Sequence, residues 1–483
     1  MKNFEWVLEN ISVVLSIVIM ILLLGCGIFL TIKLRFFQVR KFNYALNNTI
    51  NPTIKSIFKK NKDKTNEVSA FSAFSTAVSG TVGTGNIVGV ATAISLGGAG
   101  SVFWMWVSAF FGMVTNYAEN VLGMYFRKKH NDEYKGGPMY YIEKGLNLKW
   151  LAVIFAVFAA IASIGFNFAQ ANSISTSIND LTNIPLWVIG IVISVISGLV
   201  LIGGIKRISR FSSFVVPFMV IIFLGLSTTI IVINYKNIPS SFNEIFKSAF
   251  NFKSVSGGIL GYGITRAMRY GISRGIFSNE AGLGSSVMAH AQSSEKEPVI
   301  QGLWGVFSIF LDTFVICSLT ALVLLTTNAF DTNLEGASIA LYAFSKTYGM
   351  FGKIIFTIIL TLFAFTTLIS WGFYGIKAIE YIFGNIGVKI FKVIYVLLSI
   401  VGSVIAVNVV WTISDIFNVL MAIPNLIALI ALSGLVKNIT KNYFDRKKGI
   451  EVAKIISYDV FTTLEVNKID EWWMPKFRHY FFI

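Results

Sequence analysis

Long apolar runs recur along the whole chain, and they restrict its possible folds more than any other feature of the sequence. A helix that crosses the hydrocarbon of a bilayer needs roughly 20 apolar residues. About eleven runs approach or exceed this length: 12–32, 68–96, 101–126, 151–174, 186–204, 213–234, 256–290, 302–327, 351–384, 389–410 and 415–436. Only 13% of the 483 residues are charged, against roughly a quarter in soluble proteins. We therefore predict an all-α integral membrane protein with about eleven transmembrane helices, which excludes a water-soluble enzyme.

The connections between the apolar runs carry most of the positive charge, and its distribution predicts the orientation of the chain. The formal net charge is +16, and Lys and Arg gather in the segments 33–64, 127–149 and 206–210 and in the tail. Cytoplasmic loops are enriched in Lys and Arg. With an odd number of spans, this pattern places the N-terminus outside the cell membrane and the tail, 441–483, in the cytoplasm. The basic segments lack the interleaved aromatic residues that stack on bases, so we expect contact with anionic lipids and none with nucleic acid.

Two of the apolar runs contain glycine-rich polar stretches. The second run includes residues 79–86, with three glycines and several hydroxyl groups. In the seventh run, glycines at 257, 258, 261 and 263 precede the polar stretch 273–284. Each glycine inside a helix costs roughly 1 kcal/mol relative to alanine, and irregular backbone is tolerated in a membrane only where protein or water surrounds it. We therefore predict that both helices break inside the membrane.

Close packing of helices through small residues is the alternative interpretation of these glycines. It accounts for Gly97, Gly98 and Gly100. It does not explain Asn86 and Asn279, because buried polar groups need partners. A phosphate-binding loop is excluded, since the required strand and P-loop lysine are missing.

The spacing of the two interrupted runs predicts the organisation of the chain. They lie five spans apart, and paired interruptions at corresponding positions of two halves indicate a transporter site at a repeat interface. We therefore expect a transporter domain over 1–440, with one five-helix repeat at about 68–234 and a second at about 256–436. The run 12–32 precedes them as an extra helix, because it is too long for the apolar core of a signal peptide and lacks a convincing cleavage site.

Two facing breaks of this kind suit a zwitterion. The N-terminus of a half-helix offers N–H groups to a carboxylate, and a C-terminus offers carbonyls to an ammonium group or Na⁺. No acidic or basic side chain lies in the first stretch, so the expected substrate is a small neutral amino acid. Gln170 in the fourth run and Thr366, Thr367 and Trp371 in the ninth could complete the site. Threonines often bond back to a carbonyl one turn earlier, and a buried tryptophan often only packs, so both interpretations stay open for them.

Four stretches resemble the alanine or glycine:cation symporter family. They are 76–87 (TAVSGTVGTGNI), 97–107 (GGAGSVFWMWV), 136–142 (GGPMYYI) and 275–284 (GIFSNEAGLG), within a similarity that runs from about residue 10 to about 440. The resemblance implies a LeuT-type core of two inverted five-helix repeats. It also implies that sodium, or in some members a proton, drives the uptake of alanine or glycine.

The resemblance further implies roles for individual residues. It places the backbone of Gly80, Thr81 and Gly83 at the carboxylate, Phe277, Ser278 and Asn279 at the second break near the amine and methyl group, and Gln170 and Trp371 around the rest of the pocket. For sodium it implies the carbonyls of Ser79 and Val82 and the hydroxyls of Thr366 and Thr367. Sodium is then the coupling ion, and no organic cofactor is expected.

The predicted function is sodium-coupled symport of alanine or glycine by alternating access, and a proton-coupled carrier is the alternative within the same fold. A channel would show a filter assembled from repeated or oligomeric loops. A membrane enzyme would need a clustered catalytic site, which three scattered histidines do not supply. Six charged residues inside the runs form either gate pairs or structural ion pairs: Glu119, Arg266, Arg269, Arg274, Glu280 and Asp312.

Overall fold

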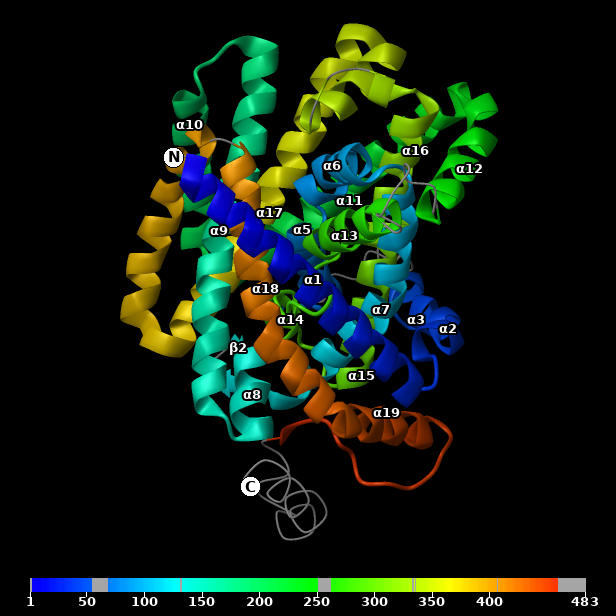
Figure 1. Ribbon diagram of the computed structural model, residues 1–483. Helices are drawn as coiled ribbons and strands as arrows, with labels where there is room; N and C mark the ends of the chain where they lie inside the picture. The colour runs from blue at the N-terminus through cyan, green and yellow to red at the C-terminus, as the bar shows by residue number, and fades with distance from the viewer. Residues whose placement is uncertain are drawn as a thin grey trace.

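The described part of the chain is a bundle of helices with one small hairpin of strands (Figure 1). The computed structural model describes residues 2–53, 68–130, 133–250, 262–331, 334, 336–405 and 407–458. The basic residues at 55–64, the glycines at 257, 258 and 261, and most of the basic tail lie outside these ranges.

The N-terminal half contains the first broken helix and the hairpin. Its elements are α1 (Lys2–Lys33), α2 (Phe37–Arg40), α3 (Phe42–Asn48), α5 (Ala70–Thr81), η1 (Thr84–Asn86), α6 (Val88–Gly97), α7 (Gly100–Phe126), β1 (Lys128–His130), β2 (Glu133–Lys135), α8 (Pro138–Leu146), α9 (Lys149–Thr182), α10 (Leu186–Ile202) and α11 (Gly204–Ile233). The strands β1 and β2 pair antiparallel, with Lys128 opposite Lys135.

The C-terminal half contains the second broken helix and a short amphipathic end. Its elements are η2 (Tyr235–Asn237), α12 (Ile238–Ala249), α13 (Tyr262–Asn279), α14 (Val287–His290), α15 (Pro298–Ile309), η3 (Phe310–Cys317), α16 (Ser318–Thr326), η4 (Ala329–Asp331), α17 (Ala337–Val404), α18 (Val407–Ala431) and α19 (Ser433–Lys447). A π-helical stretch, η3, joins α15 to α16, and such stretches often occur at functional sites.

Two groups of helices meet around the first broken segment. In one group, α9 packs against α10, α17 and α18, and in the other α7 packs against α13 and α15 (Figure 1). α5 contacts α17 of the first group and α13 and α15 of the second. α1 crosses the outside of both groups, against α18 and α7. The break between α5 and α6 therefore lies where the two groups face each other.

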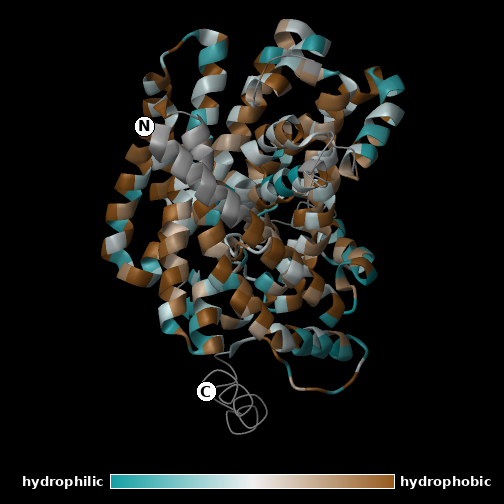
Figure 2. Cartoon of the chain, in the orientation of Figure 1, coloured by the Kyte–Doolittle hydropathy of each residue, from teal (hydrophilic) through white to brown (hydrophobic). Residues whose placement is uncertain are grey.

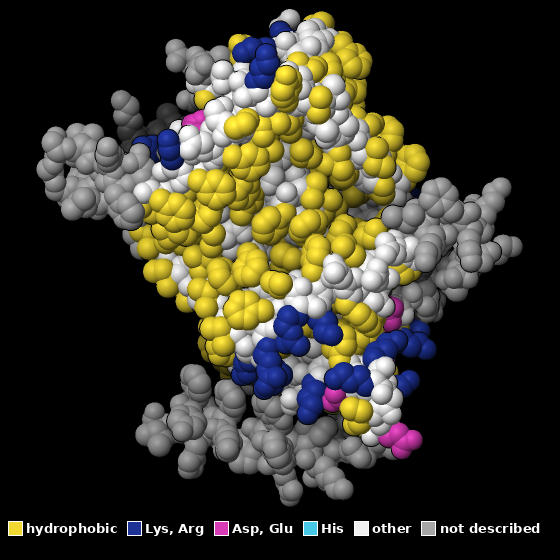
Figure 3. Space-filling view, turned by 90° about the vertical axis from the view of Figure 1, so that its right-hand side faces the viewer, with side chains coloured by type: hydrophobic (Ala, Val, Ile, Leu, Met, Phe, Trp, Pro, Cys, Tyr) yellow, Lys and Arg dark blue, Asp and Glu magenta, His cyan; other side chains and the backbone are white. Residues whose placement is uncertain are grey.

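An apolar belt crosses the middle of the face in Figure 3, and apolar residues recur along most of the described helices (Figure 2). Phe214 and Ile221 of α11 and Ile386 of α17 are 77%, 68% and 77% exposed. Lys and Arg gather below the belt on the face in Figure 3, at the end of the molecule that carries α19. A large exposed apolar surface of this kind faces lipid.

The described helices account for the apolar runs only in part. Five of them are long and apolar enough to cross a membrane, or six if the bent pair α5 and η1–α6 counts as one span. Gly349 and Gly384, with φ of 59° and 62°, divide the 68 residues of α17. Glycine adopts this left-handed region without steric cost. Gly384 thus separates the ninth run from the tenth, and the total of eleven spans stays a prediction.

Both predicted interruptions are present. α5 and the segment of η1 and α6 are bent by 57° relative to each other. The second interruption lies later than the sequence suggested, because α13 continues through Gly275 to Asn279 and helix resumes only at Val287. Between them Glu280, Gly282 and Gly284 adopt φ of 57°, 90° and 75°, which no α-helix allows. The stretch 277–279 therefore forms the last turn of α13, at the edge of the break and not inside it.

Candidate functional site

The side chain of Asn86, at the end of the first break, stabilises the non-helical backbone there. Val82 is extended, with φ of −79° and ψ of 92°, and Gly83 is more extended still. The side-chain oxygen of Asn86 accepts a hydrogen bond from the N–H of Gly83 at 2.8 Å. Because this amide replaces a helical partner, the backbone leaves the helix without an unpaired N–H at Gly83.

Three of the four oxygen groups expected around sodium come together at this break. The hydroxyl of Thr367, on α17, lies 3.0 Å from the carbonyl oxygen of Ser79 and 3.3 Å from that of Val82. A Cβ at Gly83 would lie 2.3 Å from the Thr367 hydroxyl oxygen. Glycine at this position therefore lets α17 approach the unwound backbone closely.

Thr366 does not reach this point in the structure. Its hydroxyl donates to the carbonyl of Phe363 at 3.0 Å and lies 3.8 Å from the sulfur of Met219. Successive residues of an α-helix point about 100° apart, so adjacent threonines cannot both face one point. The structure thus brings together Ser79, Val82 and Thr367, and leaves Thr366 on another face of α17.

A chain of serine hydroxyls lies beside the same carbonyls, and Ser212 is the member that the sequence did not indicate. The hydroxyl of Ser79 lies 2.5 Å from that of Ser370 and 3.0 Å from that of Ser212. Ser370 also donates to the carbonyl of Thr76 at 3.1 Å. Ser212 belongs to α11, far away in sequence, so no local pattern could have indicated this contact.

Several buried polar atoms near the first break lack a partner among the described residues. Gln170, on α9, accepts a hydrogen bond from the N–H of Thr84 at 3.3 Å, but its side-chain N–H₂ has none. The hydroxyls of Thr84 and Tyr374 are likewise buried without a partner. Tyr374 lies against the break, since a Cβ at Gly80 would be 2.6 Å from its hydroxyl oxygen. Each such orphan costs about 1–3 kcal/mol, which a polar ligand would recover.

The second break lies next to the first. A Cβ at Gly85 would lie 3.1 Å from the Cα of Ser278, so the two segments are nearly in backbone contact. Asp312 of η3 joins them: one carboxylate oxygen accepts from the Asn86 side chain at 2.7 Å, and the other from Ser278 at 2.9 Å. The side-chain N–H₂ of Asn279 donates to Thr313 at 3.1 Å. The breaks therefore form one polar region bridged by Asp312.

An aromatic stack closes one side of this region. The ring of Phe166, on α9, stacks on Trp371 of α17, with centroids 3.6 Å apart, and on Phe277 of α13, with centroids 4.5 Å apart. Trp371 is completely buried. The sequence predicted Trp371 and Phe277 at the site but not Phe166, because an aromatic residue in an apolar run gives no signal that separates a pocket wall from a lipid contact.

The structure shows the side-chain partners of four of the six charged residues for which the sequence left two interpretations open. Arg274 forms an ion pair with Asp415 of α18, with N–O distances of 3.1 and 2.9 Å. Glu119, Glu280 and Asp312 are fully buried, and neutral side chains donate hydrogen bonds to each of them.

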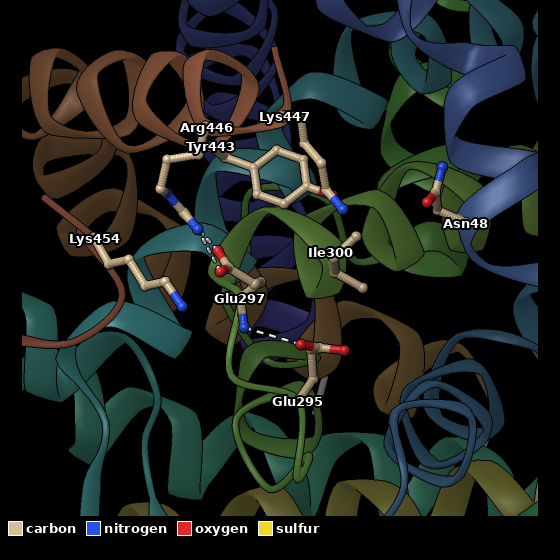
Figure 4. Close-up of a pocket in the computed structure, with 8 residues that line it drawn as sticks. All are labelled: Asn48, Glu295, Glu297, Ile300, Tyr443, Arg446, Lys447 and Lys454. Carbon is tan, nitrogen blue, oxygen red and sulfur yellow. Dashed lines mark hydrogen bonds and ion pairs between the residues drawn. The ribbon is translucent and has the colours of Figure 1, made fainter. Parts of the chain in front are cut away.

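A pocket opens at the end of the molecule that carries α19 (Figure 4). Its volume is about 490 Å³, and Asn48, Glu295, Glu297, Ile300, Tyr443, Arg446, Lys447 and Lys454 line it. Arg446 and Glu297 form two hydrogen bonds of 2.7 Å across it. This pocket joins α19 to the start of α15 and contains none of the predicted site residues. The breaks, with their unpartnered buried groups, are therefore the better candidate for a substrate site.

The sequence matches known transporters over most of its length. The profile of the sodium:alanine symporter family matches residues 1–456. The sodium/alanine symporter AgcS of Methanococcus maripaludis is 41% identical over 442 residues, which cover 89% of this chain and 95% of AgcS.

The chain belongs to the sodium:alanine symporter family.

The relatives of this chain differ in their named substrates. The probable sodium/glutamine symporter GlnT of Bacillus subtilis is 35% identical over 437 residues, covering 90% of this chain and 89% of GlnT. Membership makes this protein a membrane transporter and not an enzyme.

The structural comparison identifies the fold. The crystal structure of MhsT in complex with L-phenylalanine aligns with a TM-score of 0.57 and 15% identity, over 76% of this chain and 89% of MhsT. This chain therefore has the LeuT fold that the sequence predicted. The residues that bind its substrate and ion are a separate question, which the geometry of the two breaks addresses.

Proposed function

We propose that this transporter carries a small neutral amino acid, alanine or glycine, together with sodium, by alternating access. The observation that carries the proposal is the set of unpartnered buried groups around the first break: the side-chain N–H₂ of Gln170 and the hydroxyls of Thr84 and Tyr374. Buried polar groups are nearly always paired. A ligand with a carboxylate is the simplest partner for donors gathered beside unwound backbone.

The substrate's two charges match the two breaks. We assign its carboxylate to the donors Gln170 and Tyr374 beside the backbone of Gly80, Thr81 and Gly83 that the family resemblance implies. The N–H of Gly83 would first have to leave the side chain of Asn86. The amine and the methyl group lie at the end of α13, where Phe277, Ser278 and Asn279 are placed. The C-terminus of a helix carries partial negative charge, which suits an ammonium group. We assign the stack of Phe166 and Trp371 as the wall that limits the size of the substrate's side chain.

Sodium is assigned to the carbonyl oxygens of Ser79 and Val82 and the hydroxyl of Thr367. Hard cations prefer oxygen ligands of this kind. The family resemblance adds Thr366, whose hydroxyl would first have to leave the carbonyl of Phe363. Because the ion and the carboxylate use the same unwound segment, each orders the backbone for the other, and the coupling is reciprocal.

The energy available to such a carrier is sufficient for strong accumulation. One positive charge moved through roughly 100 mV gains about 2.3 kcal/mol. A tenfold sodium gradient adds about 1.4 kcal/mol. One sodium ion per substrate therefore supports an accumulation of roughly 500-fold.

The proposed orientation places the N-terminus outside the cell membrane and α19 with the basic tail in the cytoplasm. The Lys and Arg below the apolar belt in Figure 3 support it, since cytoplasmic segments carry the excess of these residues. The repeats proposed at about 68–234 and 256–436 each contain one of the two breaks.

Labelled alanine uptake into proteoliposomes tests the proposed function. We expect uptake that saturates with alanine and requires an inward sodium gradient. Proton coupling is the second candidate, and the buried carboxyl group of Asp312 between the breaks favours it. Alanine uptake driven by an inward proton gradient in sodium-free buffer would show that protons, and not sodium, are the coupling ion. No uptake under either gradient would contradict both the sodium-coupled and the proton-coupled proposal.

Gln170→Ala should weaken alanine binding. The variant removes the acceptor of the Thr84 N–H and one proposed donor to the carboxylate, so we expect the Kd of alanine to rise about 10- to 100-fold. Alanine binding to purified protein by calorimetry measures this change. Gln301→Ala is the matched control, because that buried glutamine bonds His290 elsewhere in the molecule. Wild-type affinity in Gln170→Ala would make Gln170 a packing residue.

Trp371→Ala should admit larger substrates. Removing the indole opens space beside Phe166, so valine, leucine or glutamine should compete with labelled alanine at least ten-fold better than in the wild type. The expected loss of folding stability is about 3–5 kcal/mol, so protein abundance is measured alongside. An unaltered substrate range would show that Trp371 does not line the pocket.

A further inference from the structure

Glu280 occupies a position in the second break where glycine would fold more easily. Glu280, Gly282 and Gly284 have φ of 57°, 90° and 75°. Glycine adopts this region freely, whereas a residue with a long side chain rarely does. The Glu280 side chain is also fully buried, although a carboxyl group at this depth in a membrane protein is costly. A buried glutamate in a strained backbone conformation, just before two glycines in the same region, indicates that its side chain has a function.

Both oxygens of that carboxyl group have partners. One accepts a hydrogen bond from the indole N–H of Trp371 at 2.7 Å, and the other accepts one from the hydroxyl of Ser285 at 2.5 Å. Ser285 belongs to the same break, whereas Trp371 belongs to α17. Glu280 therefore ties the wall of the pocket directly to the broken segment.

One set of contacts around Trp371 forms a closed ring, and a further edge contact joins Trp371 to Tyr374 with ring centroids 5.6 Å apart. Its indole stacks on Phe166 with an interplanar angle of 8°, Phe166 stacks on Phe277 at 13°, and Phe277 lies three residues before Glu280 on the same segment. Stacked aromatic pairs hold the faces of their rings together and are worth about 0.5–1.5 kcal/mol beyond the area that they bury. The hydrogen bond to Glu280 is the directional contact in the ring, so it fixes where the indole lies within its plane.

We propose that Glu280 is a positioning residue that holds Trp371 in place and thereby sets the upper size limit of the transported amino acid. The proposal rests on the proposed function, in which Trp371 limits the space beside the substrate. It assigns to the buried glutamate neither an ion nor a substrate contact. Loss of its side chain should therefore change which amino acids are accepted more than it changes the sodium requirement.

Competition experiments in proteoliposomes test this proposal. Unlabelled alanine and unlabelled glutamine compete with labelled alanine, and the ratio of their half-inhibitory concentrations gives the preference for the smaller substrate. Glu280→Gly removes the side chain and relieves the backbone strain, so the variant should fold, and its preference should fall about ten-fold. Glu280→Gln should keep the wild-type preference, because its amide oxygen can still accept the indole N–H.

Three further variants separate positioning from a general structural role. Ser285→Ala removes the other partner of the carboxyl group and should leave the preference unchanged. Trp371→Phe keeps the stacking but lacks the N–H, so it should match Glu280→Gly, and the double variant should show no further loss.

Two results would overturn the proposal. One is an unchanged preference in Glu280→Gly, and the other is an additive loss in the double variant. A wild-type protein that takes up no alanine would overturn the proposed function as well, which distinguishes the two failures.

Discussion

Gly83→Ala is expected to abolish sodium-dependent uptake. The backbone at Gly83 has φ of −144°, which alanine also adopts, so the effect does not come from backbone strain. It comes from space: the new Cβ would lie 2.3 Å from the hydroxyl oxygen and 3.0 Å from the Cβ of Thr367. Either α17 or the unwound segment must move, and both movements separate the Thr367 hydroxyl from the carbonyls of Ser79 and Val82.

The measurement is alanine uptake in proteoliposomes over a range of sodium concentrations, where we expect a loss of at least 100-fold. This corresponds to about 2.7 kcal/mol, within the usual cost of an overpacked site. Gly89→Ala is the matched control, because a Cβ there has nothing within 4 Å and alanine favours the helix α6. Wild-type sodium activation in Gly83→Ala would show that the contact between α17 and the break does not serve the ion.

The two breaks could be predicted from the sequence because their signal is local. Glycines lower helix stability, and asparagines at membrane depth need partners, so 79–86 and 273–284 stood out among apolar neighbours. The start of the second break could not be predicted in the same way. Gly275 stays helical within α13, since one glycine weakens a helix without ending it. The break begins where Glu280 takes a positive φ, and a glutamate gives no sequence signal for that conformation.

Side-chain direction was harder to predict than backbone. Thr366 and Thr367 are equivalent in sequence, and only the rotation of α17 against α5 shows that Thr367 faces the carbonyls of Ser79 and Val82. Tyr374 follows Trp371 by three residues and so shares its helix face, a signal that could have placed it at the site. Its closeness to Gly80 depends on packing between elements far apart in sequence.

The partners of the acidic residues could not be predicted from the sequence for a different reason. A buried carboxyl group can satisfy its oxygens with an ion pair or with neutral donors, and composition does not distinguish the two. Arg274 pairs with Asp415, a partner that the sequence did not suggest. Asp312 instead receives hydrogen bonds from Asn86 in the first break and from Ser278 at the edge of the second. These contacts link segments that are nearly 200 residues apart, since Asn86 and Ser278 lie 192 positions from each other.

Thr367→Ala should raise the sodium concentration needed for half-maximal uptake at least ten-fold, with little change in protein abundance. The variant removes the only side-chain oxygen assigned to the ion by the geometry and leaves the carbonyls of Ser79 and Val82 in place. A hydrogen bond to a charged group is worth about 1.5–3 kcal/mol. We expect the loss of one oxygen ligand to weaken sodium binding by a similar free energy. Thr367→Ser retains the hydroxyl and should behave like the wild type.

Thr366→Ala tests whether Thr366 is a sodium ligand, as the family resemblance implies, or lies outside the sodium site, as the geometry indicates. If the hydroxyl bonded to Phe363 stays where the structure places it, this variant changes sodium activation less than two-fold, whereas a ligand role would produce a shift as large as that of Thr367→Ala.

The coupling between sodium and alanine binding gives a second, independent test of Thr367. Because linkage is reciprocal, a weakened sodium site in Thr367→Ala must also lower the apparent affinity for alanine at a fixed, subsaturating sodium concentration, and saturating sodium must restore it. A variant that lowers the maximal rate alone, with both half-saturation values unchanged, would place Thr367 in the packing of α17 and remove it from the ion site.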